Sequence, residues 1–104
     1  MKIDAIQIKK ADNVATSLRD IQAGEEVTVG VSDATSRITI LENIPHGHKF
    51  AVRPIPKGET ILKYGEVIGR ATQDIATGKH AHVQNIESLR GRGDWGAKSG
   101  ANGI

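Results

Sequence analysis

Four histidines, grouped in two pairs, are the residues of this chain whose types and spacing could do chemistry. One residue separates His46 from His48, and one separates His80 from His82. In an extended strand, alternate side chains share a face, which would put His80 and His82 about 7 Å apart at a rise of roughly 3.3 Å per residue. Two imidazoles at that distance can share a metal only if other segments supply further ligands. The pattern is compatible with part of a metal or anion site, and equally with surface or interface histidines.

Two lysines add positive charge near these candidates. Lys49 follows His48 directly, so the two side chains could act together as donors to an anion. Lys63 begins the segment Lys63-Tyr64-Gly65 and could bind a carboxylate. Each position also has a plainer interpretation. His48-Lys49 could be a polar turn that faces solvent, and Tyr64 could simply pack in the core while Gly65 turns the chain.

A repeated turn must position these residues. The pattern Ile-x-x-Gly occurs four times, and an apolar residue follows three positions after each glycine. The four copies begin at Ile21, Ile44, Ile55 and Ile75. Glycine readily adopts the positive φ of a tight turn, and proline presets φ at the second position of two copies. Four such turns at irregular spacing predict a compact, turn-dense β protein rather than a solenoid.

Short strands are expected between the turns, and no segment shows a helical period over ten residues. The expected strands cover residues 2–9, 14–18, 27–31, 37–41, 49–52, 60–63, 67–71 and 80–86. Asp12-Asn13 is expected to be local turn chemistry between the first two strands. From residue 90 onward glycine is dense and apolar residues are scarce. The sequence therefore predicts one all-β domain over residues 1–89 and a flexible glycine-rich tail over residues 90–104.

Composition excludes several classes of function. The 104 residues carry a net charge of +2 with only 3% aromatic residues, which argues against a nucleic-acid-binding protein. No apolar run reaches the roughly 20 residues of a membrane span, and no signal peptide opens the chain. The chain has no cysteine, which excludes disulfides and thiolate chemistry and fits a cytoplasmic protein.

An ordered string of motifs resembles the small SAF domain of the altronate/galactarate dehydratase family. The resemblance covers residues 1 to about 94. Its segments are Asp12-Asn13-Val14-Ala15-Thr16, Gly47-His48-Lys49-Phe50-Ala51, Lys63-Tyr64-Gly65 and the run from Gly78 to Asn85. The family pattern often has a third histidine where this chain has Gln84, and a carboxamide is a poor ligand for a transition metal.

This resemblance implies an all-β, SAF-like β-clip fold and a place in a lyase. The implied role is that of the small subunit of a sugar-acid dehydratase. Such a subunit is inactive alone and binds a large catalytic subunit, and it could also form a homo-oligomer. The implied cofactor is a divalent metal such as iron(II), completed by the large subunit. His80 and His82 are the candidate metal ligands, and His48, Lys49 and Lys63 the candidate substrate-binding residues. Two alternatives stay open: the small subunit of sulfolactate sulfo-lyase, and a non-catalytic module that binds a small acid, a saccharide or a protein.

Overall fold

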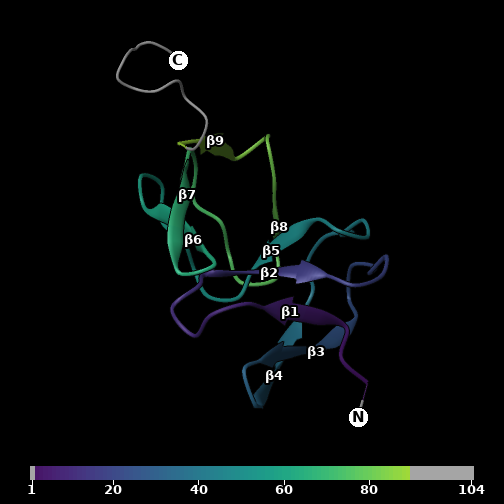
Figure 1. The fold of residues 1–104 in the computed structure, drawn as a ribbon. Helices are drawn as coiled ribbons and strands as arrows, with labels where there is room; N and C mark the ends of the chain where they lie inside the picture. Colours follow the sequence, from purple (N-terminus) through teal and green to yellow (C-terminus); the bar gives the residue numbers. More distant parts are fainter. Residues whose placement is uncertain (1, 90–104) are drawn as a thin grey trace.

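The computed structural model describes residues 2–89, and no helix occurs among them (Figure 1). The strands are β1 (Ala5–Gln7), β2 (Val14–Ser17), β3 (Glu26–Val31), β4 (Ala34–Thr39), β5 (Lys49–Ala51), β6 (Thr60–Lys63), β7 (Glu66–Ala71), β8 (His80–Ala81) and β9 (Ile86–Ser88). The all-β fold that the sequence predicts is therefore confirmed. The described residues include no helix that could span a membrane.

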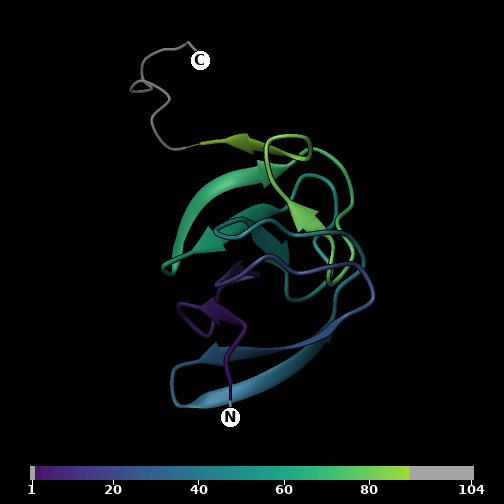
Figure 2. The ribbon, with the colours of Figure 1, turned by 90° about the vertical axis from the view of Figure 1, so that its right-hand side faces the viewer.

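The strands form two sheets. The larger has the order β4-β3-β1-β2-β5-β8, and the smaller has the order β6-β7-β9. All neighbours are antiparallel except β1 and β3, which are parallel. Figures 1 and 2 show the smaller sheet stacked at one end of the larger, with the N-terminal strands at the opposite end. The chain thus crosses from one sheet to the other after β5, returns for β8, and crosses again for β9.

The four Ile-x-x-Gly segments are the turns that the sequence predicts. Their glycines have φ between +85° and +95°, and all four isoleucines are 1% exposed. The turns also pair with each other. Ile21 and Ile44 exchange two backbone hydrogen bonds of 2.9 and 2.8 Å, and Ile55 and Ile75 do the same at the same two lengths. Each isoleucine therefore anchors a turn in the core and ties it to a second turn.

The core is aliphatic and lies in two adjoining clusters. The first is built on β1 to β5 and contains Phe50, the one fully buried aromatic side chain of the described residues. The second lies between β5, β8 and the smaller sheet, and is made of Val14, Ala51, Ile55, Ile61, Ala71, Ile75 and Ala81. Because β5 contributes Phe50 to one cluster and Ala51 to the other, this short strand is the joint between the two halves of the domain.

Asp12 and Asn13 tie the two sheets together. The Asn13 side chain accepts the amide of Leu62 at 2.8 Å and donates to the carbonyl of Thr60 at 2.9 Å. The Asp12 carboxylate accepts the amides of Tyr64 at 3.1 Å and Gly65 at 2.8 Å. Both side chains are fully buried. The predicted local turn chemistry is present, since Asp12 also accepts the amide of Lys9, but the main role of the pair is long-range.

One predicted strand is wrong. Residues 80–86 do not form a continuous strand, because β8 ends at Ala81 and a turn over residues 82–85 leads into β9 of the other sheet. The amide of Asn85 donates to the carbonyl of His82 at 3.1 Å, which closes that turn. The predicted tail, residues 90–104, lies outside the described residues.

Candidate functional site

Three histidines from two distant segments meet at the joint between the sheets. The rings of His48, His80 and His82 are stacked, with centroids 4.1 to 5.3 Å apart and planes inclined by 16° to 22°. His48 Nδ1 lies 2.9 Å from His80 Nε2, and one ring nitrogen of each histidine lies within 4.8 Å of the others. All three are partly exposed. We call this group the histidine triad.

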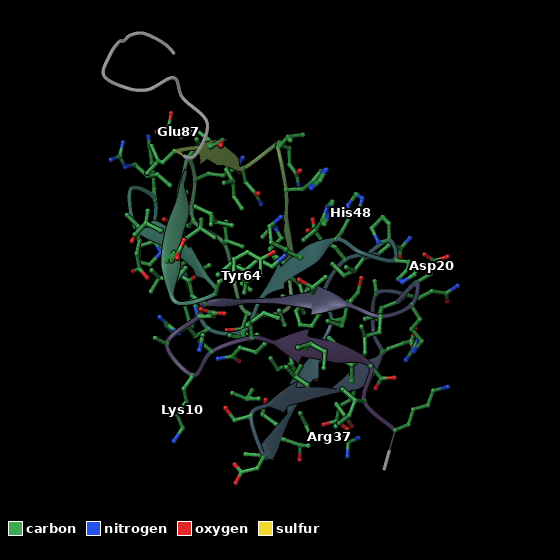
Figure 3. The ribbon with its side chains drawn as sticks, in the orientation of Figure 1. Lys10, Asp20, Arg37, His48, Tyr64 and Glu87 are labelled. Atoms are coloured by element: carbon green, nitrogen blue, oxygen red, sulfur yellow. The ribbon has the colours of Figure 1, made fainter. Side chains whose placement is uncertain are left out.

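The turns and one strand pair bring the triad together. His48 follows the Gly47 turn, and His80 stands two residues after Gly78. β5 and β8 then pair antiparallel with Phe50 opposite His80. Figure 3 shows the labelled His48 beside β5, which lies between β2 and the edge strand β8 of the larger sheet. The turn geometry that the Ile-x-x-Gly pattern encodes therefore delivers both segments to the same place.

Asn85 fixes the direction in which the chain leaves His80. Its side-chain oxygen accepts the amide of His82 at 2.9 Å, and its side-chain nitrogen donates to the carbonyl of His80 at 2.8 Å. The carboxamide is buried, so both bonds are shielded from water. Because β8 stops and turns here, His82 is held against the triad although it is no longer part of a strand.

Two further side chains contact His80. The carboxylate of Glu42 accepts the amide of His80 at 2.9 Å and lies 3.9 Å from the ammonium group of Lys79. The side-chain nitrogen of Gln84 lies 3.2 Å from His80 Nδ1. Gln84, which stands where a third histidine is expected, is therefore beside the triad. Sequence analysis missed Glu42, since no spacing connects it to the histidines.

The surroundings favour the neutral imidazole at His80 and at His82. Desolvation lowers the pKa of His80 and of His82, and electrostatic interactions with His48 and Lys49 lower both further, while the Glu42 carboxylate acts in the opposite direction on His80. Desolvation also lowers the pKa of Lys49, followed by the effect of the Lys63 charge. Neutral imidazole is the form of histidine that binds metals, so the lowered pKa values of His80 and His82 favour the metal-binding form of these two rings.

The triad fits a divalent transition metal. Imidazole nitrogens bind zinc at about 2.0–2.1 Å, which places two tetrahedral ligand atoms about 3.4 Å apart. One ring nitrogen of each histidine lies within 4.8 Å of the others, so a small movement of the rings could bring three nitrogens to that distance. Three imidazoles also leave coordination positions open for a substrate or a ligand from another chain. His46, the fourth histidine, is exposed and does not join the group.

A cavity of about 420 Å³ adjoins the triad. His82 is part of its wall, together with Lys49, Lys63, Tyr64, Ile68, Val83, Ile86 and Ser88. The two lysines come from different sheets, Lys49 from β5 and Lys63 from β6. The structure thus brings Lys49 and Lys63 to the same cavity, while it groups His48 with the other histidines.

The β6–β7 turn forms one side of this cavity. Tyr64 adopts a φ of +62°, a conformation that is uncommon for a residue other than glycine, and Gly65 has a φ of +73°. Asp12 holds this turn through the amides of both residues. The expected turn at Gly65 is confirmed, but the expectation that Tyr64 packs in the core is wrong. Its side chain is 48% exposed, and the ammonium group of Lys63 lies 5.0 Å from the ring centroid.

Comparison with known proteins gives one matching family and several relatives. The family model described as "Altronate/galactarate dehydratase SAF domain" matches residues 3–89. Altronate dehydratase of Bacillus subtilis (strain 168) is 45% identical over 84 residues, which are 80% of this chain and 16% of that protein. Galactarate dehydratase (L-threo-forming) of Escherichia coli (strain K12) is 37% identical over 75 residues, 70% of this chain and 13% of that protein.

A third relative matches this chain over nearly its whole length. The (2R)-sulfolactate sulfo-lyase subunit alpha of Chromohalobacter salexigens is 36% identical over 93 residues, which are 86% of this chain and 99% of that protein. This chain therefore spans about a sixth of the altronate dehydratase but nearly all of the sulfo-lyase subunit.

Proposed function

The chain belongs to the altronate/galactarate dehydratase SAF domain family, and we propose that it is the small subunit of a metal-dependent lyase that removes water from a hydroxy acid. The relatives named as dehydratases and a sulfo-lyase place the chain in a lyase family. The substrate class of the proposed enzyme is that of altronate and galactarate, the acids in the names of the dehydratases.

One observation carries the proposal: the histidine triad and the two lysines border the same open surface. His82 belongs both to the triad and to the cavity wall. A group that binds metals therefore lies next to a cationic cavity of about 420 Å³. Elimination of water from a hydroxy acid can use this combination, a cation that binds the carboxylate and a metal that assists the leaving hydroxyl.

The roles of the residues follow from their chemistry. Lys49 and Lys63 would bind carboxylate groups of the substrate and orient it along the cavity. His48, His80 and His82 would hold the metal, with Asn85 fixing the backbone between the last two. A divalent metal, when bound, stabilises the hydroxyl group as it leaves. The base that removes the proton next to the carboxylate is assigned to the large subunit.

The partner is a large catalytic subunit. In the altronate dehydratase, the region like this chain is a small part of a larger protein, and the sulfo-lyase relative is by its name one subunit of an enzyme. The triad and cavity also lie at the surface rather than inside the domain, so a second chain could complete them. We therefore propose that the active site forms at the interface and that the isolated chain does not turn over substrate.

A second candidate is the alpha subunit of a sulfolactate sulfo-lyase. The specific observation in its favour is the match over 99% of that subunit. The reaction class would be the same, an elimination from a hydroxy acid, with sulfite in place of water as the leaving group.

Reconstitution tests the proposal and separates the candidates. The chain is mixed with a candidate large subunit from the same organism, the complex is isolated, and a panel of hydroxy acids is assayed for the unsaturated or keto product and for sulfite. Turnover of a sugar acid by the complex, and by neither chain alone, is expected. Sulfite release from sulfolactate would favour the second candidate, and a chain that forms no complex and supports no elimination would contradict both.

A further inference from the structure

His80 has a different neighbour at each of its two ring nitrogens. Its Nε2 lies 2.9 Å from Nδ1 of His48, within the triad, and its Nδ1 lies 3.2 Å from the side-chain nitrogen of Gln84. Nε2 is thus the nitrogen that is placed to bind a metal together with His48. The environment of the other nitrogen is set by Gln84, a residue that has no role in the proposed function.

The backbone of His80 is held on both sides, which leaves the ring as its movable part. The amide of His80 donates to the carboxylate of Glu42 at 2.9 Å, and its carbonyl accepts from the side chain of Asn85 at 2.8 Å. Gln84 is held in a similar way, because its carbonyl accepts from the side-chain nitrogen of Gln73 at 3.1 Å. The backbone therefore keeps the ring of His80 and the carboxamide of Gln84 within reach of each other.

These contacts assign the ring protons of the metal-free chain. A neutral imidazole has one N–H donor and one acceptor nitrogen, and an amide nitrogen can only donate. Nδ1 of His80 therefore accepts from Gln84, Nε2 of His80 carries the ring proton, and Nδ1 of His48 accepts from it. Donation runs from Gln84 through His80 to His48. This order puts a proton on the nitrogen of His80 that a metal would need.

Metal binding at Nε2 of His80 requires the other tautomer. The proton has to leave Nε2, and the ring stays neutral if the proton moves through water to Nδ1. A half-turn of the Gln84 carboxamide then presents its oxygen as the acceptor for Nδ1–H. Metal-binding histidines usually donate their second N–H to an oxygen in this way, which fixes the ring. A carboxylate can only accept and an aliphatic side chain can do neither, so a carboxamide suits both states.

From this geometry we propose that Gln84 is a positioning residue for the metal site, and that its carboxamide turns together with the proton of His80. It donates to Nδ1 in the metal-free chain and accepts from Nδ1–H when Nε2 binds a metal. The inference rests on the proposed function, because it concerns the metal site of the same enzyme. Gln84 acts on the metal through His80, by stabilising the tautomer that leaves Nε2 free to bind.

The position of the ring proton can be measured directly by NMR. Nitrogen-15 chemical shifts of the imidazole rings distinguish the two tautomers, and they are recorded on the full chain with and without equimolar Zn²⁺, a diamagnetic ion. In the unmodified chain, His80 is expected to carry its proton on Nε2 without metal and on Nδ1 with Zn²⁺. In Gln84→Glu, whose carboxylate can only accept, the proton is expected on Nδ1 in both states. A merely structural role of Gln84 would not change this spectroscopic signature.

The affinity for Zn²⁺ is a second measurement. Gln84→Met keeps the length of the side chain and removes donor and acceptor, so we expect binding about tenfold weaker. Gln84→Glu should bind Zn²⁺ at least as tightly as the unmodified chain, because its carboxylate accepts from Nδ1–H. Gln22→Met, on an exposed turn of the N-terminal half, is the matched control and should leave the dissociation constant unchanged. Melting temperatures show that the variants fold.

Three results would each overturn the inference while leaving the triad as the metal site. They are a proton on Nδ1 of His80 in the metal-free unmodified chain, an unchanged tautomer in Gln84→Glu, and equal Zn²⁺ affinities of Gln84→Met and Gln22→Met. Absence of Zn²⁺ binding to the unmodified chain would overturn both the inference and the proposed metal site. The expected tautomers and affinities in a chain that supports no elimination with a large subunit would confirm the role of Gln84 and contradict the proposed reaction alone.

Discussion

The buried carboxylate of Asp12 accepts the amide of Gly65 at 2.8 Å, although 53 residues separate the two along the chain. The same carboxylate accepts the amides of Lys9 and Tyr64. It thereby holds the turn that presents Lys63 and Tyr64 to the cavity. One side chain from the loop between β1 and β2 thus holds the β6–β7 turn of the smaller sheet, beside the cavity where ligand binding is proposed.

Replacing Asp12 should cost stability and disturb the cavity. Asp12→Ala removes the acceptor of three backbone amides, and we expect a loss of about 3 kcal/mol in the free energy of unfolding. The loss of stability in Asp12→Asn should be smaller than in Asp12→Ala, because only one of the two acceptor oxygens is replaced, by a donor. Urea denaturation measures both. Asp33→Ala, in the exposed turn between β3 and β4, is the control, and an equal loss in that variant would contradict the assigned role of Asp12.

Gly78→Ala should destabilise the fold more than Gly58→Ala. The two glycines have nearly the same φ, +87° and +92°, so a side chain meets the same backbone strain of about 1–2 kcal/mol. A Cβ at Gly58 would meet no atom within 4 Å, whereas a Cβ at Gly78 would lie 2.1 Å from the carbonyl oxygen of Thr39. The second turn must therefore move, and His80 with it. Equal melting temperatures of the two variants would show that this close approach has no energetic consequence.

The histidine triad is expected to bind divalent transition metals in the isolated chain. Titration with Co²⁺ should give visible absorption bands of a histidine-bound ion, with one ion per chain. His48→Ala and His82→Ala should each weaken binding by about tenfold or more, because each removes one of three protein ligands. His46→Ala is a matched control outside the triad. Unchanged spectra in both triad variants would remove the triad as the metal site.

Gln84→His should strengthen metal binding. The Gln84 side chain already lies 3.2 Å from His80 Nδ1, so an imidazole at this position can reach the neighbourhood of the triad. Imidazole is a far better ligand for these metals than a carboxamide. The expected result is a lower dissociation constant for Co²⁺ than in the unmodified chain. Gln22→His, on an exposed turn of the N-terminal half, controls for an added surface histidine, and the same gain there would refute the placement of Gln84.

Acid should weaken the N-terminal half through Asp4. The amide of Thr28 donates to its carboxylate at 2.9 Å, and this bond, with that from Arg19, lowers the pKa of Asp4 below its ordinary value. The ionised form is therefore favoured in the folded state. Its contribution is complete above the ordinary aspartate pKa of about 3.9 and is lost as the pH falls through the folded-state pKa. Denaturation at pH 6 and pH 3 should differ less in Asp4→Asn than in the unmodified chain. A difference that Asp4→Asn leaves unchanged would assign the acid sensitivity to other groups.

The sequence predicted much of the fold because its turns are encoded locally. Isoleucine and glycine at a fixed spacing specify a buried anchor and a positive φ, and the four turns starting at Ile21, Ile44, Ile55 and Ile75 all form. The end of β8 at Ala81 was not predictable in the same way. It depends on Asn85, whose hydrogen bonds to the His80 and His82 backbone are visible only once the turn has formed.

The candidate site was predictable in its residues but not in its grouping. Strand spacing suggested that His80 and His82 are neighbours, and they are. It did not suggest that His48 completes a triad with them, since that depends on the pairing of β5 with β8. The exposure of Tyr64 was missed for a related reason, because Asp12 holds its turn from 52 residues away.

The two isoleucine bridges separate segments whose sequence can vary from segments whose backbone course is fixed. The bridge between Ile21 and Ile44 closes a loop that contains the β3–β4 hairpin, and the bridge between Ile55 and Ile75 closes a loop that contains the β6–β7 hairpin. Away from the pairing of β1 with β3 and from the contacts of Asp12 and Asn13, side chains of a hairpin inside a closed loop can change while the backbone outside the bridge keeps its course. The first hairpin contributes nothing to the cavity wall, but the second supplies Lys63, Tyr64 and Ile68. Descendants of one ancestral domain could therefore acquire different ligand preferences by altering the second hairpin, while the turns beyond the bridges keep the three histidines together.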